Sequence, residues 1–322
     1  MFQILHGLNV DWMGRRYFAY IISGIMLTAS LVSLIVHGGP RYGVDFTGGT
    51  LIEAAVRPAP TPEAVRSAVE RAGFARAEIQ QGIDRPDEFL IRLGVSEAGT
   101  DPAPAVEAAL RSITSGTQVE LLRVETVGPR VGGELRSNAI KAVFLALGLI
   151  LVYVAARYDW RYSVGAVVAL FHDVFISLGV LSILDREVTL TVVAALLTLA
   201  GFSINDKVVV FDRIRERKQA LRREPPDKVM NMGINETLSR TIITNGTVAL
   251  STLALYLFGG DVIHDFSLAM LVGAVVGTYS SLYVASALAL ELQLWGERSA
   301  GRHRTTSSTG TAGSTRRASS TK

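Results

Sequence analysis

The sequence YFAYIISGIMLTASLVSLIV, residues 17–36, carries no charged side chain over its whole length and decides what kind of fold the chain can adopt. A helix needs about 20 mainly apolar residues to cross the hydrocarbon core of a bilayer. This run has that length, and it exceeds the roughly 7 to 15 apolar residues of a signal peptide. We therefore interpret it as an uncleaved membrane anchor.

Five further apolar runs along the chain are each long enough to form a spanning helix. They are residues 139–156, 162–184, 188–211, 241–258 and 266–292. The composition agrees, because 49% of the 322 residues are hydrophobic and only 19% are charged. The sequence therefore predicts a polytopic α-helical membrane protein with six transmembrane helices.

Charges in the loops predict the side of the membrane that each loop occupies, because short loops rich in Lys and Arg stay in the cytoplasm. Basic residues precede the first span and crowd the loops after the second, fourth and sixth spans, whereas the alternate loops contain acids. The basic set is Arg15, Arg16, Arg157, Arg161, Arg213, Arg215, Arg217, Lys218, Arg222, Arg223, Lys228, Arg298, Arg302 and Arg304, and the acids are Asp185, Glu187, Asp261 and Asp265. Both termini are expected in the cytoplasm, with residues 37–136 outside.

The external segment, residues 37–136, has about the length of one small domain. Its pattern predicts strands at 51–56, 76–81, 89–93 and 118–127, and helices at 61–72 and 101–113. The order βαββαβ is that of a small α+β ferredoxin-like domain. The segment holds no cluster of His, Ser or Cys that could run a reaction, which favours a binding or lever role.

Two glycine-rich motifs flank this domain: GVDFTGGT, residues 43–50, and GPRVGGELR, residues 128–136. The first lacks the Lys-Ser/Thr pair of a Walker phosphate loop and is expected outside the cell, so a nucleotide site is excluded. Glycine permits positive φ and close backbone approach, and Phe46 is expected to anchor at the membrane interface. A hinge and an ordinary loop capped by Asp45 are about equally favoured. The candidate hinge residues are Gly43, Asp45, Phe46, Gly48, Gly49, Gly132 and Gly133.

Two polar faces are expected within the membrane, on the fourth and fifth spans. A charge near the bilayer centre costs about 2.5 to 3.5 kcal/mol on insertion scales, so such residues mark pathways or partners. Asp206 borders the fourth-span face, and Arg240 lies at a similar depth on the fifth span, which predicts that the two meet. The other members are Thr191, Thr198, Ser203, Asn205 and Asp212 on the fourth span and Thr244, Thr247 and Ser251 on the fifth.

Two more ionisable residues lie within the predicted spans. Asp173, beside His172, is about halfway along the third span and must face protein or water, because its side chain is short. Lys207 points about 100° away from Asp206 and is expected to extend to the cytoplasm. The alternative role for all these groups is to fasten helices together, at about 1 kcal/mol each. A proton relay is favoured over that role for Asp206 with Arg240, and the two are balanced for Asp173.

The remaining features set the domain boundaries and exclude several kinds of site. Gly273, Gly277 and Ser281 predict close helix packing on the sixth span, and the low-complexity residues 293–322 predict a disordered cytoplasmic tail. The domains are therefore 1–36, 37–136, 137–292 and 293–322. The chain has no cysteine, its five histidines show no metal-binding spacing and its net charge is only +3. We expect no disulfide, no metal, no cofactor and no nucleic-acid partner.

Five motifs in order along the chain resemble one known family. They are GVDFTGGT, VGPRVGGELR, HDVFISLG, FSINDKVVVFDRIRE and SRTIITN, at residues 43–50, 127–136, 172–179, 202–216 and 239–245. Together they resemble the SecF-type subunits of the SecD/SecF protein-export family, within the resistance-nodulation-division superfamily, up to about residue 292. The resemblance implies a bacterial inner-membrane accessory of the Sec translocon that uses the proton-motive force to draw preproteins across.

The same resemblance implies residue roles and partners. It assigns the proton pathway to Asp206 and Arg240, with a further carboxylate from a SecD-like partner subunit. This chain departs from the family pattern at Lys207, where the family commonly has a small residue. The expected partners are that subunit in a heterodimer, the translocon channel, unfolded preprotein and protons, with no enzymatic activity. Two alternatives remain: a proton-coupled small-molecule or lipid transporter of the same superfamily, and a non-catalytic membrane scaffold.

Overall fold

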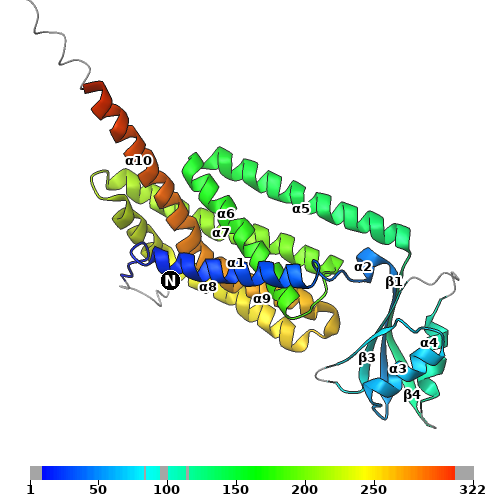
Figure 1. Cartoon of the computed structure of the whole chain (residues 1–322). Coiled ribbons are helices and arrows are strands. Elements are labelled where there is room, and N and C mark those ends of the chain that lie inside the picture. Colours follow the sequence, from blue (N-terminus) through cyan, green and yellow to red (C-terminus); the bar gives the residue numbers. More distant parts are fainter. Residues whose placement is uncertain (1–8, 83–84, 95–100, 114–115, 309–322) are drawn as a thin grey trace, which may run out of the picture. The chain divides into compact units, whose positions relative to one another are not determined.

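The computed structural model describes residues 9–82, 85–94, 101–113 and 116–308 (Figure 1). The chain divides into two compact units, each of which is described by itself. A helical unit contains the residues up to 39, residues 146–186 and the residues from 194 onward. A smaller unit contains residues 40–145 and 187–193.

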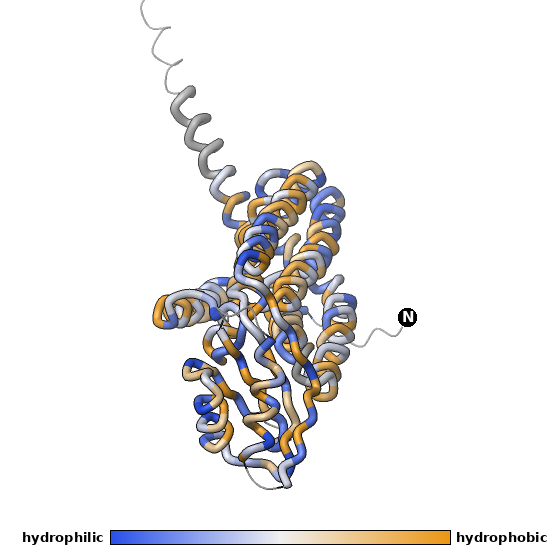
Figure 2. The backbone as a smooth tube through the Cα atoms, turned by 90° about the vertical axis from the view of Figure 1, so that its right-hand side faces the viewer, coloured by the Kyte–Doolittle hydropathy of each residue, from blue (hydrophilic) through white to orange (hydrophobic). Residues whose placement is uncertain are grey.

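The described residues include six helices, or continuous helical runs, that are long and apolar enough to cross a membrane, as predicted. Apolar residues follow one another along these helices (Figure 2). The elements are α1 (Arg16–Val36), α5 (Pro129–Arg157), α6 (Trp160–Ile183), α7 (Leu190–Ala220), α8 (Pro226–Phe258) and the sixth run, which comprises α9 (Asp261–Tyr279), η1 (Ser280–Ala285) and α10 (Ser286–Ser308).

Three helices continue well beyond their predicted apolar ranges. Helix α5 begins at Pro129, α7 continues to Ala220 and α8 begins at Pro226. Proline at the first position of α8 suits a helix start, because its missing N–H would have no partner there. Hydropathy detects only the apolar part of such helices. Residues 128–136 were predicted as a glycine-rich connection ahead of the second span. That prediction is wrong for Gly132 and Gly133, because both lie inside helix α5.

The sixth span is not one regular helix. Six residues, Ser280–Ala285, form a π-helical turn between α9 and α10. Such turns are rare and often occur at functional sites. The helix then continues to Ser308, so the predicted tail is wrong for residues 293–308; the stretch from Ser286 is rich in Ala, Leu, Glu and Gln, which favour helix. The rest of that predicted tail, residues 309–322, lies outside the described residues.

The small unit contains the predicted βαββαβ order, and its ferredoxin-like fold is confirmed. The elements are β1 (Gly49–Arg57), α3 (Pro62–Arg71), β2 (Glu78–Gln81), β3 (Glu88–Leu93), α4 (Ala103–Arg111) and β4 (Gln118–Val127). The strands form one sheet in the order β2-β3-β1-β4, and β1 pairs antiparallel with both β3 and β4. Helices α3 and α4 pack together on one face of this sheet (Figure 1).

The helix starts and the core of this domain follow from its sequence. The Thr61 hydroxyl accepts from the Ala64 N–H at 3.3 Å, and the Asp101 carboxylate accepts from the Ala103 N–H at 3.0 Å, so each polar residue satisfies a free donor at a helix start. The apolar core is fully buried. It includes Ile52, Val56, Val65, Val69, Phe89, Ile91, Val106 and Leu110. Each such side chain contributes about 1.5 to 3 kcal/mol by its burial.

The two glycine-rich motifs pack against each other. In GVDFTGGT the short helix α2 (Val44–Thr47) is followed by Gly48, and Gly49 begins β1. Their φ values of 74° and 127° favour glycine. A Cβ atom on Gly132 would lie 3.0 Å from the Gly48 nitrogen, and one on Gly48 would lie 2.9 Å from the Pro129 Cα. Phe46 is buried and its ring meets that of Tyr42 edge-on, so its predicted exposure at the membrane interface is wrong.

Candidate functional site

Asp206 lies buried in a polar contact between α7 and α8, with only 6% of its surface exposed. Its Oδ1 accepts a hydrogen bond from the Thr241 hydroxyl at 2.9 Å, and its Oδ2 lies 3.4 Å from the donating Asn245 Nδ2. Asn245 Nδ2 also donates to the Thr278 hydroxyl on α9 at 2.8 Å. The carboxylate thus joins α7 to α8, and Asn245 extends the hydrogen-bond network to α9.

The predicted partner of Asp206 is not the one that it contacts. Arg240 is exposed, and within the described part of the chain no ion pair joins it to Asp206. Arg240 does lie level with Asp206, because its neighbour Thr241 contacts that carboxylate. However, consecutive residues on a helix point about 100° apart. Helix α8 is turned so that Thr241, the next residue, faces Asp206 and the guanidinium points away from the bundle.

The two predicted polar faces lie largely on the outside of the chain. On α7 the side chains of Thr191, Thr198 and Asn205 are exposed, and on α8 Thr247 and Ser251 are exposed while Thr244 is half-buried. Two residues of the predicted α7 face differ from the rest. Ser203 is buried beside Asp173, and Asp212 accepts from the Tyr158 hydroxyl at 2.9 Å. The hydroxyls of Thr198, Thr247 and Ser251 donate to carbonyls of their own helices.

A second buried cluster surrounds Asp173 and contains Lys207. The Lys207 Nζ lies 2.7 Å from Asp173 Oδ2, and neither side chain is exposed to any extent. The prediction that Lys207 extends to the cytoplasm is therefore wrong. Its side chain instead finds a buried carboxylate on α6 together with two hydroxyls, Ser203 on α7 and Ser280 at the start of η1.

The second cluster continues toward α1 through a chain of hydrogen bonds. His172 Nδ1 lies 3.0 Å from Asp173 Oδ1, and His172 Nε2 lies 3.1 Å from the Ser23 hydroxyl. Ser23 in turn lies 3.0 Å from the Tyr279 hydroxyl. Small residues bring the helices this close, since Gly277 on α9 faces both Ser203 and Asp173 and Gly273 faces Leu199. The predicted packing role of Gly273 and Gly277 is confirmed.

Several residues of both clusters escaped prediction. Ser23, Tyr279 and Ser280 carry no signal in the sequence, because hydroxyls are common in membrane helices and their partners lie more than 70 residues away. Thr241 and Asn245 could have been found, since they are four residues apart and so share one face of α8.

The loop GVDFTGGT reaches the start of α7 within the small unit. The Gly43 N–H donates to the Val188 carbonyl at 3.0 Å, and Tyr42 forms an isolated parallel bridge with Val188. Asp45 Oδ2 accepts from the Leu190 N–H at 2.8 Å, so Asp45 caps α7 rather than its own loop. The space around Gly133 is open, and nothing in the structure explains that glycine.

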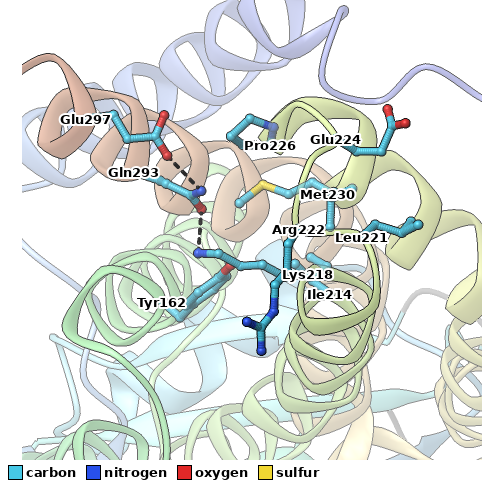
Figure 3. A pocket seen from close by; sticks show the side chains of 11 residues that line it. Tyr162, Ile214, Lys218, Leu221, Arg222, Glu224, Pro226, Met230, Gln293 and Glu297 are labelled. Atoms are coloured by element: carbon cyan, nitrogen blue, oxygen red, sulfur yellow. Dashed lines mark hydrogen bonds between the residues drawn. The ribbon is translucent and has the colours of Figure 1, made fainter. Parts of the chain in front are cut away.

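A separate cavity of about 300 Å³ lies where α6 begins and α7 ends (Figure 3). Lys218 donates to Gln293 at 3.2 Å, and Gln293 donates to Glu297 at 3.2 Å. The charged groups lining the cavity are Lys218, Arg222, Glu224 and Glu297, so the lining has no net charge and does not favour one sign of ligand. Within the described residues, no group of three or more His, Cys, Asp or Glu side chains is placed to hold a metal.

Comparison with known protein families gives two matches within this chain. Residues 105–295 match the family described as protein export membrane protein SecD/SecF, C-terminal. Residues 33–60, which contain GVDFTGGT, match the SecD/SecF GG motif. The first match spans more than half of the chain and includes both buried clusters apart from Ser23.

Relatives of known function and a solved structure agree with the family matches. The chain is 42% identical over 293 residues to protein translocase subunit SecF of Escherichia coli O157:H7, covering 90% of each chain. It is 44% identical over 295 residues to that of Vibrio alginolyticus, covering 91% of this chain and 93% of the relative. The crystal structure of SecDF, a translocon-associated membrane protein from Thermus thermophilus, matches with a TM-score of 0.81 at 40% identity, covering 91% of this chain and 40% of that longer chain.

Proposed function

This chain belongs to the SecD/SecF family of protein-export membrane proteins, and we propose that it uses the proton-motive force to promote preprotein export through the Sec translocon. In this proposal it is a multi-pass protein of the bacterial inner membrane with both termini in the cytoplasm. In this proposal it works with a SecD-like subunit, and the support is its match to 40% of the chain named SecDF.

The observation that carries the proposal is the position of Asp206. It is a buried carboxylate within a spanning helix, and the groups that it contacts are a hydroxyl and an amide rather than a cation. A carboxylate without a fixed counter-charge can exist both ionised and protonated, which is what a proton relay requires. A purely structural acid would instead be expected to have a permanent cationic partner.

The contact with Asn245 supplies a way for the helices to respond to a proton. The ionised Asp206 accepts from Thr241 and from Asn245 Nδ2, whereas a protonated carboxyl also has an O–H to donate. Asn245 Oδ1 is buried and has no hydrogen-bond partner among the described residues, so it is an acceptor that such an O–H can use. Protonation would therefore turn the Asn245 amide and disturb its bond to Thr278 on α9.

The driving force is large enough for this change in packing. One elementary charge moving through the membrane potential yields about 2.3 kcal/mol per 100 mV, which is comparable with a helix-packing difference of a few kcal/mol. Helix α7 carries the response along its length, because it begins at Leu190 beside the GVDFTGGT loop and contains Asp206. The exported domain would then move and keep the emerging chain from sliding back.

Arg240 has its role at the surface that meets the partner subunit. It is exposed, as are the polar residues Asn205 on α7 and Thr247 on α8, and both helices are long and apolar enough to cross a membrane. An uncompensated guanidinium facing lipid is costly, so we propose that a carboxylate of the SecD-like chain covers it. This replaces the predicted direct pair with Asp206 by a pair across the subunit interface.

The test is export into vesicles after the ATP-driven step, with and without a proton gradient. Asp206→Asn, reconstituted with its SecD-like partner, is expected to lose the gradient-dependent acceleration and to keep the ATP-driven part. Asp212→Asn is the matched control, because Asp212 is on the same helix but pairs with Arg157 and Tyr158. An Asp206→Asn protein that still responds fully to the gradient would refute the proposal.

Two competing functions predict other outcomes. A small-molecule or lipid transporter would move its substrate without any preprotein, whereas the external domain here is a single small sheet with two helices and offers little room for a substrate funnel. A non-catalytic scaffold would lose assembly, and no gradient-dependent rate, when Asp206 and Arg240 are both neutralised.

A further inference from the structure

Lys207 is a cation held entirely inside the helical unit. All three N–H groups of its ammonium have acceptors: Asp173 Oδ2 at 2.7 Å, the Ser203 hydroxyl at 2.5 Å and the Ser280 hydroxyl at 3.0 Å. The side chain is 0% exposed. A buried ammonium needs a carboxylate and satisfied hydrogen bonds to remain charged, and this site supplies both.

One oxygen of Asp173, Oδ2, is surrounded by donors alone. Its Oδ2 accepts from Lys207, from the Ser203 hydroxyl at 2.6 Å and from the Ser280 hydroxyl at 2.7 Å. His172 Nδ1 lies 3.0 Å from its Oδ1. A proton on Oδ2 would need an acceptor in place of one of the three donors there, whereas His172 Nδ1 can donate to or accept from Oδ1 according to its tautomer. The surroundings therefore fit the ionised form of Asp173, which is a poor proton carrier.

Lys207 is also the immediate neighbour of Asp206 along α7. The groups that face Asp206 from α8 are Thr241 and Asn245, both uncharged, and Asn245 links it to Thr278 on α9. Arg240 on α8 is exposed and turned away. On the α6 side the titratable groups are Asp173, which pairs with Lys207, and His172, which contacts Asp173. The cation that could act most directly on the charge of Asp206 is therefore the Lys207 ammonium, and Asp173 already neutralises it.

We propose that Asp173 is a positioning residue that captures and neutralises Lys207, and thereby leaves the adjacent Asp206 free to take up a proton. An ammonium without its own counter-ion would favour the ionised form of a nearby carboxylate and so hold Asp206 unprotonated. The biological meaning of this inference rests on the proposed function of Asp206. It separates two acids that the sequence alone could not tell apart: Asp206 takes up the proton, and Asp173 balances the charge of Lys207.

The test measures the protonation of Asp206 directly and involves no transport. A hydrophobic carbodiimide adds to a protonated carboxyl in an apolar site: the acid O–H adds across one C=N bond, and the adduct rearranges to a stable N-acylurea. The purified full chain is labelled in lipid vesicles over a range of pH, and the adducts at Asp206 and Asp173 are quantified by peptide mass spectrometry. The wild type is expected to be labelled at Asp206 and not at Asp173.

The decisive comparison is between a single and a double variant. Asp173→Asn leaves Lys207 without its counter-ion, and labelling of Asp206 at a fixed pH is expected to fall about tenfold or more. Asp173→Asn combined with Lys207→Met removes both charges and is expected to restore wild-type labelling. Glu236→Gln is the control, since Glu236 pairs with Arg213 and Arg217 outside both clusters and should leave the Asp206 profile unchanged. Equal Asp206 labelling in wild type and folded Asp173→Asn protein overturns the proposal.

Lys207→Met decides the matter if Asp173→Asn does not fold. Without the ammonium, Asp173 loses the group that holds it ionised, and it should become labelled while Asp206 remains labelled. Asp173 staying unlabelled, or Asp206 losing its label, would contradict the proposal. These results do not depend on export, so a failure of the proton-coupling proposal in vesicles would be recognised separately from a failure of this one.

Discussion

Asp45 Oδ2 accepts a hydrogen bond from the backbone N–H of Leu190 at 2.8 Å, which joins the glycine-rich loop to the first residue of α7. The first N–H groups of a helix have no partner within the helix, so a carboxylate there both satisfies a donor and interacts favourably with the helix dipole. The acid of GVDFTGGT therefore stabilises the start of the same helix that carries Asp206 and Lys207.

Removing this cap should destabilise the protein measurably. Asp45→Ala is expected to cost about 1 kcal/mol of unfolding free energy, and Asp45→Asn should cost less, because an amide oxygen can still accept. Thermal unfolding of the full chain in detergent reads the effect as a lowered Tm. Asp159→Ala is the control, since Asp159 precedes α6 but its side chain makes no cap hydrogen bond. Equal losses in Asp45→Ala and Asp159→Ala would contradict the capping role.

Glycines in the two motifs should respond differently to one added methyl group. Gly49 has φ 127°, and a Cβ there would lie 2.3 Å from the Leu93 carbonyl oxygen, so Gly49→Ala should cost about 2 kcal/mol or more. Gly133 has open space around it within helix α5, so Gly133→Ala should be neutral or stabilise by about 0.5 to 1 kcal/mol. Chemical denaturation measures both. Similar effects of the two substitutions would show that the close approach at Gly49 is unimportant.

The hydroxyl of Thr241 should matter for gradient-dependent export. Thr241→Val keeps the shape but removes a hydrogen bond to Asp206, a kind of bond worth about 1.5 to 3 kcal/mol. We expect a reduced gradient-dependent rate and a shifted pH profile, with Thr241→Ser close to wild type. Thr252→Val is the control, because that buried hydroxyl bonds only to carbonyls of its own helix. A normal pH profile in Thr241→Val would remove Thr241 from the pathway.

The exposed polar faces should lie against the partner subunit. The chain has no cysteine, so a single introduced thiol is the only one present. Asn205→Cys and Thr247→Cys are expected to cross-link to a SecD-like chain in membranes, whereas Val275→Cys, on an exposed apolar position of α9, should not. Cross-linking at position 275 and none at 205 or 247 would assign the interface to another face.

The small α+β domain should lose a stabilising contact in acid. Burial raises the pKa of Glu78, but its hydrogen bonds and charge interactions with Arg41 and Arg92 outweigh this and hold the pKa below its ordinary value. A carboxylate whose pKa is lower when folded stabilises the fold above its unfolded pKa, and this contribution is lost as pH falls through the folded pKa. Hydrogen exchange of β2 and β3 should therefore differ between wild type and Glu78→Gln at neutral pH, and the difference should shrink in acid. A difference that does not depend on pH would contradict the ion pairing.

Much of this fold could be predicted because hydrophobic patterns are local. A run such as residues 17–36 specifies a spanning helix without reference to any other part of the chain, and the alternation at residues 118–127 specifies a strand in the same way. Helix ends were harder, since the polar extensions of α5 and α8 carry no hydropathy signal. The level of Arg240 along the bundle was also predictable, since its neighbour Thr241 contacts Asp206.

The direction in which each side chain points was not predictable, and that is where the candidate site departed from expectation. Whether Arg240 or Thr241 faces Asp206 depends on the rotation of α8 about its axis, which is set by packing against α9. Lys207 turned inward because Asp173, Ser203 and Ser280 form an acceptor site that exists only in the folded bundle. Partners separated by 34 and 73 residues leave no local pattern.

The π-helical turn at residues 280–285 gives the sixth span two rotational phases. A π turn holds one residue more than an α turn, so every side chain after it is displaced by about 100° from the position that a continuous α-helix would give. This lets Ser280 bond to Asp173 while the backbone at Ala285 and Ala289 packs against Gly165. Deleting one residue of the turn would restore a single phase and send one of these two surfaces out toward the lipid.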